Sequence, residues 1–508
     1  MSTDVRRPVA SPTRRRVRTV AAVLALLVVA SCSSAQDAGS DTAPITVGQT
    51  SVLDVVDPMS TAWDLTAAGV AESVYTSDRD GTLSSRFVES ATRDDALDWT
   101  LELRDGVLFS DGSPVDAAAF ADAMNRIQTE NSLATASTGG MTFTPEGDAV
   151  AVRTTRPTMV MESVLAEWTN VVFKGDAAGG FVFTGPYAVG SLRPKEQLDL
   201  VPNTHYAEAA SRGPVGIRSF ADADAMRLAI QSGSIDMAFT ITPEVARQLQ
   251  DDPSVTVSSI EAGYQYFSML NEKVGATTDL TVRQALDLGL DRQAYVDALL
   301  GGRVATGAFA HTYSFAGDLT LGFDPAEAGR ILDRAGWVRG ADGMRAKDGE
   351  PLSLSLVTYT SRPDLSIIMQ IMVSQLKDLG IASTTSVTDD IRERLAASDW
   401  NAAVYAQHTA PTAEPSYFLN QFLRTGAANN FTGYSSPTTD GLLDRLGTLP
   451  AGAERDDLAR QIQRQVHTDL PLLFQVDPQW HIATTERLAS YRPYGGDYYV
   501  INPELGLS

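Results

Sequence analysis

The sequence contains few of the residues that build metal centres, disulfide frameworks or nucleic-acid surfaces. Its 508 residues include one cysteine and five histidines. A single cysteine excludes an internal disulfide framework and a cysteine-based zinc site, and the histidines form no H-E-x-x-H pair. Lysine and arginine total 40 against 63 acidic residues, for a net charge of −23, so a cationic surface for nucleic acid is not expected. We therefore expect no nucleic-acid partner, no built-in metal and no other cofactor.

The usual catalytic signatures are also missing. The chain has no G-x-S-x-G elbow, no P-loop and no G-x-G-x-x-G fingerprint. The segment Asp78-Arg79-Asp80-Gly81 resembles the start of a calcium loop but lacks the third ligand and the closing glutamate, so we predict a hairpin turn. These absences favour a binding protein over an enzyme. A secreted hydrolase that uses two of the many carboxylates is the alternative from another class.

The amino terminus has the charge pattern of an exported protein. Residues 1–31 hold six arginines and one acid, Asp4, and so contribute +5, which leaves −28 on the rest of the chain. The apolar run from Val20 to Ala30 has eleven residues, whereas a bilayer span needs about 20. A basic segment before a short apolar run is typical of a secretory signal peptide. The run ends Val29-Ala30-Ser31-Cys32, which resembles a bacterial lipobox and implies lipidation of Cys32 after cleavage at residue 31.

The body of the chain begins after a short tether. Residues 32–44 are rich in Ser, Asp, Gly and Ala, as in flexible linkers. Asp324 followed by Pro325 predicts the start of a helix that Gly336 ends. Strands are predicted over 352–359, 381–387 and 402–407, with a helix over 365–379. This alternation is typical of an α/β fold, and 508 residues suggest two or three domains.

Seven short segments of the body stand out by their motifs. They are Leu101–Val115, Phe183–Tyr187, Asn203–Tyr206, Gln231–Asp236, Asn271 with Val282–Arg292, Asp324–Trp337 and Asn429–Tyr434. Each segment by itself is short, and its glycines and apolar stripes also serve turns and cores. Taken in order after a lipobox, all seven resemble motifs of the extracellular solute-binding proteins of family 5, which serve peptide and nickel ABC importers. The resemblance extends over nearly the whole mature chain.

The resemblance implies a two-lobed periplasmic-binding-protein clamp of the α/β class with an extra subdomain in the first lobe. Lobe I would comprise residues 45–262 plus 476–508, with the extra subdomain at 59–165, and lobe II would comprise 263–475. A ligand enclosed between the lobes would stabilise the closed form. The expected partners are this ligand, the permease and ATPase subunits of an importer, and the membrane through a lipid anchor. A monomer is expected.

Neither ligand signature of the family is complete in this sequence. The peptide binders place an acid for the ligand's N-terminal ammonium just before an E-P-x-x-F-L-N segment. Here that segment is Glu414–Asn420, and the position of the acid holds Pro411. Ala410-Pro411 instead resembles the G-A-P-Y-D-P-H motif of nickel-type binders, but the position of its histidine holds Ser416. The sequence therefore leaves both peptides and metal chelates open as ligands.

Six residues are candidates for the ligand site. His408 could bind the metal of a chelate or, when protonated, a carboxylate, and Glu414 could pair with an ammonium group. Tyr264 and Tyr266 share one face of a predicted strand and could both reach the cleft. The other two candidates are Trp168 and Tyr405. An aromatic lining with few polar groups suits a variable ligand, and core packing or a solvated turn is the alternative explanation for each residue.

The sequence thus predicts an extracytoplasmic lipoprotein that captures peptides or peptide-like solutes for an ABC importer. The alternative within the family is the same clamp holding a nickel or metallophore chelate. The alternatives outside it are the secreted hydrolase and a sensor that reports its ligand to a membrane receptor.

Overall fold

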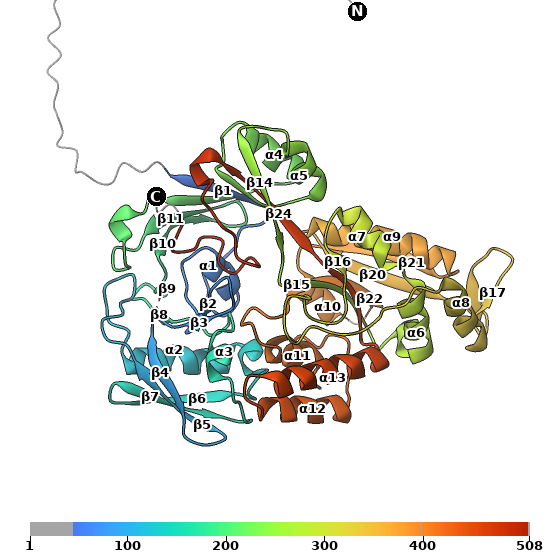
Figure 1. The fold of residues 1–508 in the computed structure, drawn as a ribbon, viewed down its shortest axis with the longest axis horizontal. Helices are drawn as coiled ribbons and strands as arrows, with labels where there is room; N and C mark the ends of the chain where they lie inside the picture. Colours follow the sequence, from blue (N-terminus) through green and yellow to red (C-terminus); the bar gives the residue numbers. More distant parts are fainter. Residues whose placement is uncertain (1–43, 398, 506–508) are drawn as a thin grey trace, which may run out of the picture. The chain divides into compact units, whose positions relative to one another are not determined.

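The fold was analysed in a computed structural model that describes residues 44–397 and 399–505. The expected signal peptide, Cys32 and the tether up to residue 43 lie outside these residues. Two large sheets organise the described chain (Figure 1). We call the part around the first sheet lobe I and the part around the second lobe II. No helix in the described ranges is both long and apolar enough to cross a membrane.

In the described part of lobe I, seven strands form a mixed sheet in the order β10-β11-β12-β1-β13-β24-β14. Its strands are β1 (Ile45–Gln49), β10 (Tyr187–Arg193), β11 (Gln197–Pro202), β12 (Val215–Ser219), β13 (Met237–Ile241), β14 (Val255–Glu261) and β24 (Gln479–Thr485). Its helices are α1 (Ala62–Ala67), α4 (Ala223–Gln231) and α5 (Pro243–Leu249). Strand β1 lies between β12 and β13 and is parallel to both, and β24 pairs with β13 and β14 in the antiparallel sense.

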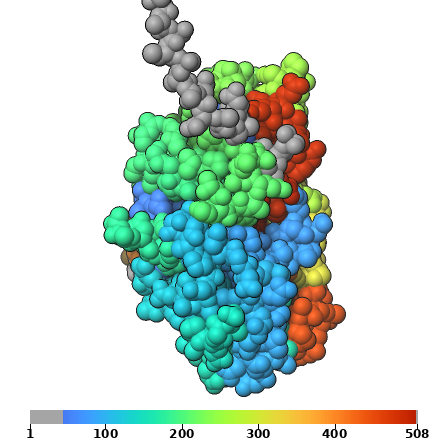
Figure 2. Space-filling model, turned by 90° about the vertical axis from the view of Figure 1, so that its left-hand side faces the viewer, coloured from blue at the N-terminus to red at the C-terminus, as the bar shows by residue number. Residues whose placement is uncertain are grey.

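A separate small sheet lies beside lobe I and forms the subdomain. Its described strands have the antiparallel order β4-β5-β7-β6, and helix α2 packs against it through Phe120, which contacts Phe143. The elements are β4 (Val88–Arg93), β5 (Asp98–Leu103), β6 (Met141–Glu146), β7 (Ala149–Thr154), α2 (Ala117–Glu130), α3 (Met161–Leu165) and the hairpins β2 (Thr76–Ser77) with β3 (Leu83–Ser84) and β8 (Phe173–Gly175) with β9 (Phe181–Phe183). Figure 2 shows one face of lobe I, in green, above the subdomain, in blue.

Lobe II has a second sheet, whose described strands follow the order β16-β23-β15-β22-β20-β21. They are β15 (Tyr264–Leu270), β16 (Arg303–Val304), β20 (Ser353–Tyr359), β21 (Ala382–Thr388), β22 (Ala402–His408) and β23 (Leu472–Asp477). The helices are α6 (Leu280–Gly289), α7 (Arg292–Leu299), α8 (Pro325–Arg334), α9 (Pro363–Asp378), α10 (Ile391–Ala396), α11 (Ser416–Leu423), α12 (Pro437–Gly447) and α13 (Ala453–Asp469), and β17 (Val338–Arg339), β18 (Arg345–Lys347) and β19 (Glu350–Pro351) form a small sheet.

The main chain passes between the two sheets at two adjacent points. Strand β14 leads through Ala262-Gly263 into β15, and β23 leads through Pro478 into β24. The amide of Ala262 donates to the carbonyl of Pro478 at 3.2 Å, which ties the two crossings together. Figure 1 shows β14 and β24 side by side at this place. Two adjacent connections of this kind are typical of a hinge. The residue bounds predicted for the lobes and the subdomain stay a prediction.

Several local predictions are confirmed. Asp324 caps α8, because its carboxylate accepts the backbone N–H of Glu327 at 2.8 Å, and Pro325 is the first helical residue. The segment from Asp78 to Gly81 joins β2 and β3 as a hairpin turn. The carboxylate of Asp78 accepts the amides of Asp80 and Thr82, so it closes the turn.

Candidate ligand-binding site

A cavity of about 860 Å³ lies between the two lobes and draws its lining from both. Lobe I contributes residues that follow β1, part of α1 and the loop after α2. Lobe II contributes the ends of β20 and β22 and the start of α10. The lobe I lining includes Gln49–Ser51, Trp63, Asp64, Asn131–Leu133 and Trp168, and the lobe II lining includes Tyr359, Arg362, Asp389–Glu393 and Tyr405–Gln407.

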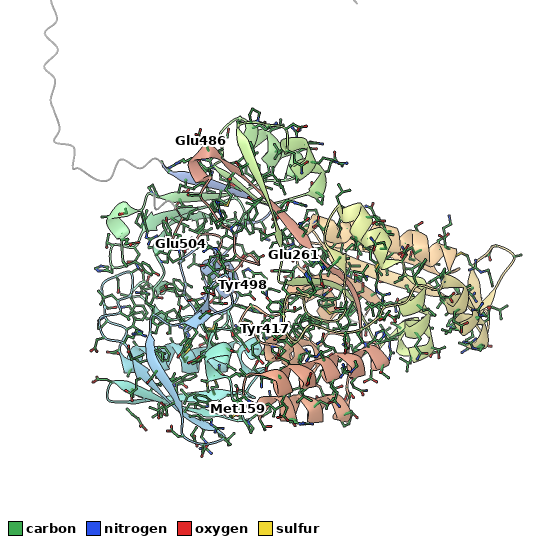
Figure 3. The ribbon with its side chains drawn as sticks, in the orientation of Figure 1. Met159, Glu261, Tyr417, Glu486, Tyr498 and Glu504 are labelled. Carbon is green, nitrogen blue, oxygen red and sulfur yellow. The ribbon has the colours of Figure 1, made fainter. Side chains whose placement is uncertain are left out.

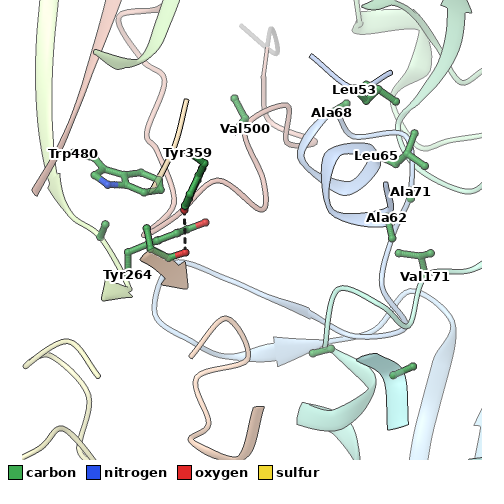
Figure 4. Close-up of a cluster of buried hydrophobic side chains, with 14 of the residues drawn as sticks. Leu53, Ala62, Leu65, Ala68, Ala71, Val171, Tyr264, Tyr359, Trp480 and Val500 are labelled. Atoms are coloured by element: carbon green, nitrogen blue, oxygen red, sulfur yellow. Dashed lines mark hydrogen bonds between the residues drawn. The ribbon is translucent and has the colours of Figure 1, made fainter. Parts of the chain in front are cut away.

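Aromatic rings from both lobes surround this cavity. The Trp63 ring lies 6.4 Å from that of Trp168 and 6.3 Å from that of Tyr264, measured between centroids. The indole N–H of Trp168 donates to the hydroxyl of Tyr417 at 2.7 Å, which joins lobe I to lobe II. The hydroxyl of Tyr359 donates to the carbonyl of Ala406 at 3.4 Å (Figure 4). The hydrogen bonds orient these rings, so the cavity has ordered aromatic walls.

Two interactions of Asp497 connect the C-terminal segment to lobe II. Its carboxylate forms an ion pair with Arg362, the residue before helix α9, and accepts the hydroxyl of Tyr264 at 2.6 Å. The guanidinium of Arg362 also lies 4.6 Å from the ring of Trp480. Burial would lower the pKa of Arg362, but Asp497 outweighs it and the pKa is raised well above the usual value. This arginine is therefore permanently charged and already neutralised inside the protein.

Asp64 is the second acid of the cavity with an unusual environment. It lies in the first turn of α1 and faces the cavity. Desolvation by the surrounding protein, and after it the nearby carboxylates of Asp497 and Asp54, raises the pKa of Asp64 to about 6, although the residue is exposed to the cavity. In the described part of the chain its carboxylate has no ion-pair or hydrogen-bond partner in another residue. Asp64 can therefore accept a hydrogen bond or a positive charge from a ligand.

Three of the six predicted site residues line this cavity, namely Trp168, Tyr264 and Tyr405. Tyr266 lies deeper on β15 and borders a separate small pocket beside Trp480. Its hydroxyl donates to Asp364 at 3.0 Å and accepts the indole N–H of Trp480 at 3.1 Å, so both of its polar contacts are internal.

Glu414 is buried beneath the start of α11 and does not line the cavity. Its carboxylate forms an ion pair with Arg455 at 2.5 Å and accepts the amide of Ser416 at 2.8 Å. Arg455 is almost fully buried, at 1% exposure. A buried guanidinium needs such a partner, so the carboxylate of Glu414 neutralises Arg455 inside lobe II.

His408 ends β22 and lines a second cavity, of about 360 Å³. Its ring lies 5.3 Å from the rings of both Tyr264 and Tyr498. Figure 3 labels Tyr498 and Tyr417 in this region, where the lobes meet. Burial lowers the pKa of His408 to about 3. The imidazole is therefore neutral near pH 7 and cannot pair with a carboxylate as a cation.

No group of three or more His, Cys, Asp or Glu side chains in residues 44–397 and 399–505 is arranged to hold a metal ion. A metal that entered the cavity would have to bring most of its ligands with it.

The residues that line the cavity but were not sequence candidates include Trp63, Asp64, Arg362, Tyr417 and Asp497. Tyr417 stands inside the segment Glu414–Asn420 that resembles the family's E-P-x-x-F-L-N motif, so a signal for it is present in the sequence. The others carry no motif, because Arg362 and Asp497 are 135 residues apart and meet only in the folded chain.

Comparison with known proteins agrees with this architecture. Residues 69–430 match the model of the bacterial extracellular solute-binding proteins, family 5. The nickel-binding protein NikA of Staphylococcus aureus is 22% identical over 94% of this chain and 96% of its own length. The probable D,D-dipeptide-binding periplasmic protein DdpA of Escherichia coli is 22% identical over 84% of this chain and 83% of its own.

Solved structures have the same fold. NikA from Staphylococcus aureus in complex with Ni(L-His)2 superposes with a TM-score of 0.83 at 21% identity, over 90% of this chain and 98% of that one. The oligopeptide-binding protein AppA from Bacillus subtilis, in complex with a nonapeptide, gives 0.78 at 18% identity, over 90% and 97%. The family match covers more than half of the sequence, and these folds share its two-lobed α/β architecture. The chain thus belongs to the bacterial extracellular solute-binding proteins of family 5.

Proposed function

We propose that this protein captures a peptide or peptide-like solute in the cavity between its lobes and delivers it to the permease of an ABC importer. The observation that carries the proposal is that both lobes line the cavity, since each supplies aromatic rings and polar groups. A ligand there contacts both lobes only when they are closed, and so shifts the population toward the closed form. The importer would then recognise closure.

The size of the cavity supports a short ligand. Sites for small molecules usually measure about 300–1,000 Å³, and this one measures about 860 Å³. Ala406 and Gln407 line it beside the aromatic walls. Such a lining can bind the backbone of a peptide while it accepts different side chains.

A metal chelate is the second candidate, because the similar NikA structure holds Ni(L-His)2. His408 does not line the main cavity, so in this variant of the proposal the chelate would bind through its organic part.

Isothermal titration separates the two candidates. We expect saturable binding of at least one of a series of di- to pentapeptides, each recovered intact afterwards. Binding of nickel plus histidine, with no heat from any peptide, would overturn the peptide proposal in favour of the chelate. Conversion of a bound peptide into fragments would instead favour the hydrolase alternative.

We also propose that the mature chain is anchored to the outer face of the cell membrane through a lipid on Cys32, which lies outside the described residues. The lipobox-like residues before Cys32 support this proposal. Import, and not sensing, is the role we propose, since the family's members are solute-binding proteins.

A further inference from the structure

The charges around the main cavity are strongly one-sided. Within the described chain, seven carboxylates and two guanidinium groups line it. The acids are Asp54, Asp64, Glu130, Asp389, Asp390, Glu393 and Asp497, and the bases are Arg362 and Arg392. A cavity with low-dielectric walls and an excess of one charge concentrates ligands of the opposite charge.

The two arginines differ in how the protein engages them. Arg362 forms its ion pair with Asp497, so its charge is neutralised. Arg392 donates to the side-chain oxygen of Asn429 at 2.5 Å and lies 5.5 Å from the ring of Phe431. Arg392 keeps its positive charge, and the seven carboxylates of the lining outnumber it.

Several of the acids have no ion-pair or hydrogen-bond partner for their carboxylate in another residue of the described chain. Glu130 pairs with Arg126, and Asp389 accepts the hydroxyl of Thr360. Asp54 and Asp64, both in lobe I, have no side-chain partner in another residue of the described part. They stand on the side of the cavity that also carries Trp63.

The electrostatic environment of Asp64 also favours a positively charged ligand. Desolvation by the surrounding protein raises the pKa of Asp64 most, the carboxylates of Asp497 and Asp54 raise it further, and Arg362 lowers it, so that the pKa is about 6. A carboxylate with a raised pKa is destabilised in its ionised form near pH 7. A positive group placed beside it would remove that cost. The neighbouring rings of Trp63 and Trp168 attract cations through their faces and give no such attraction to anions.

We infer that the ligand of this cavity is a small organic cation, a peptide-like solute with net positive charge whose ammonium or guanidinium group lies against Asp64. This inference rests on the proposed function for its choice of cavity. It differs from the family's peptide anchor, because the acid belongs to helix α1 of lobe I, whereas the position beside Glu414 holds Pro411.

The test is calorimetric titration of the full-length protein with three matched tripeptides, Lys-Trp-Lys, Gln-Trp-Gln and Glu-Trp-Glu, and with spermidine as a cation that is not a peptide. We expect Lys-Trp-Lys to bind at least about tenfold more tightly than Gln-Trp-Gln, and Glu-Trp-Glu most weakly. Added salt should reduce the difference.

Asp64→Asn should weaken binding of Lys-Trp-Lys by about tenfold and leave Gln-Trp-Gln within about twofold. The matched control is Asp224→Asn, which makes the same change in the first turn of α4, where the side chain is 73% exposed and outside the cavity. This control should leave all affinities unchanged.

The outcomes separate this inference from the proposed function. Equal binding of the three tripeptides would overturn the inference and leave peptide capture intact. Asp64-dependent binding of spermidine without binding of any tripeptide would support a cation site and contradict peptide capture. Absence of binding by both Lys-Trp-Lys and spermidine, or an Asp64→Asn variant that binds Lys-Trp-Lys as tightly as the wild type, would overturn the inference.

Discussion

Among single residues, His408 shows how burial can fix a charge state. The imidazole is enclosed by Tyr264, Tyr498 and the backbone of Gly263 and Gly496. Its pKa is lowered to about 3, whereas an unfolded histidine has a pKa near 6.5. The unfolded chain therefore binds the proton first as the pH falls, and the stability of the folded protein decreases below about pH 6.5.

We expect His408→Gln to reduce this loss. Between pH 7 and pH 5 the single histidine accounts for about 2 kcal/mol of the change in the free energy of unfolding. Urea unfolding at both pH values should show a loss smaller by about that amount in the variant than in the wild type. An equal loss in both proteins would mean that His408 is protonated in the folded state.

Residues also show where prediction from the sequence ends. Trp168, Tyr264 and Tyr405 line the cavity, and their contact with a ligand stays a prediction. Glu414 has the right chemistry for a ligand, but Arg455, 41 residues later, uses it inside the core. Sequence patterns show the type of a side chain and its local spacing. They do not show which distant charge will neutralise it.

At the scale of elements, local signals were the most informative. The capping aspartate and the proline of α8 are adjacent in the sequence, so their effect could be predicted directly. The alternating segments from 352 to 407 became β20, α9, β21, α10 and β22. The C-terminal segment that brings Asp497 and Tyr498 between the lobes has no comparable pattern, because its position depends on contacts with Arg362 and with the Trp63 ring, 4.8 Å from Tyr498.

Asp497, in this C-terminal segment, neutralises the positive charge of Arg362 beside the cavity. Asp497→Asn would leave the arginine unpaired and remove one carboxylate from the cavity. We expect the preference for Lys-Trp-Lys over Glu-Trp-Glu to fall by at least about tenfold in titrations of this variant. Asp469→Asn is a suitable control, because Asp469 accepts the hydroxyl of Tyr434 away from the cavity. An unchanged preference in Asp497→Asn would show that the ion pair does not contribute to charge selection.

For the whole molecule, the family and the two-lobed fold followed from seven short motifs in a fixed order, which the family match now confirms. The ligand did not follow, because family 5 includes proteins named for nickel, for peptides and for glutathione. The same fold can therefore enclose cavities of different chemistry, and the residues that line the cavity between the lobes determine which ligand is bound.

The proposed lipid anchor on Cys32 is also tested at the scale of the whole molecule. Cys32→Ser removes the only thiol of the chain. We expect the wild-type protein, produced in a bacterium that processes lipoproteins, to sediment with membranes and to enter the detergent phase, and the variant to lose both properties. Equal distribution of the two proteins would argue against a lipid on Cys32.

The proposed function depends on a ligand that touches both lobes. The most direct measurement is a crystal structure of the protein with the tightest-binding peptide from the titrations. We predict ligand density in the cavity of about 860 Å³, in contact with Trp63 and Asp64 of lobe I and with Tyr405 of lobe II. A peptide bound outside this cavity, or in contact with one lobe only, would contradict the account.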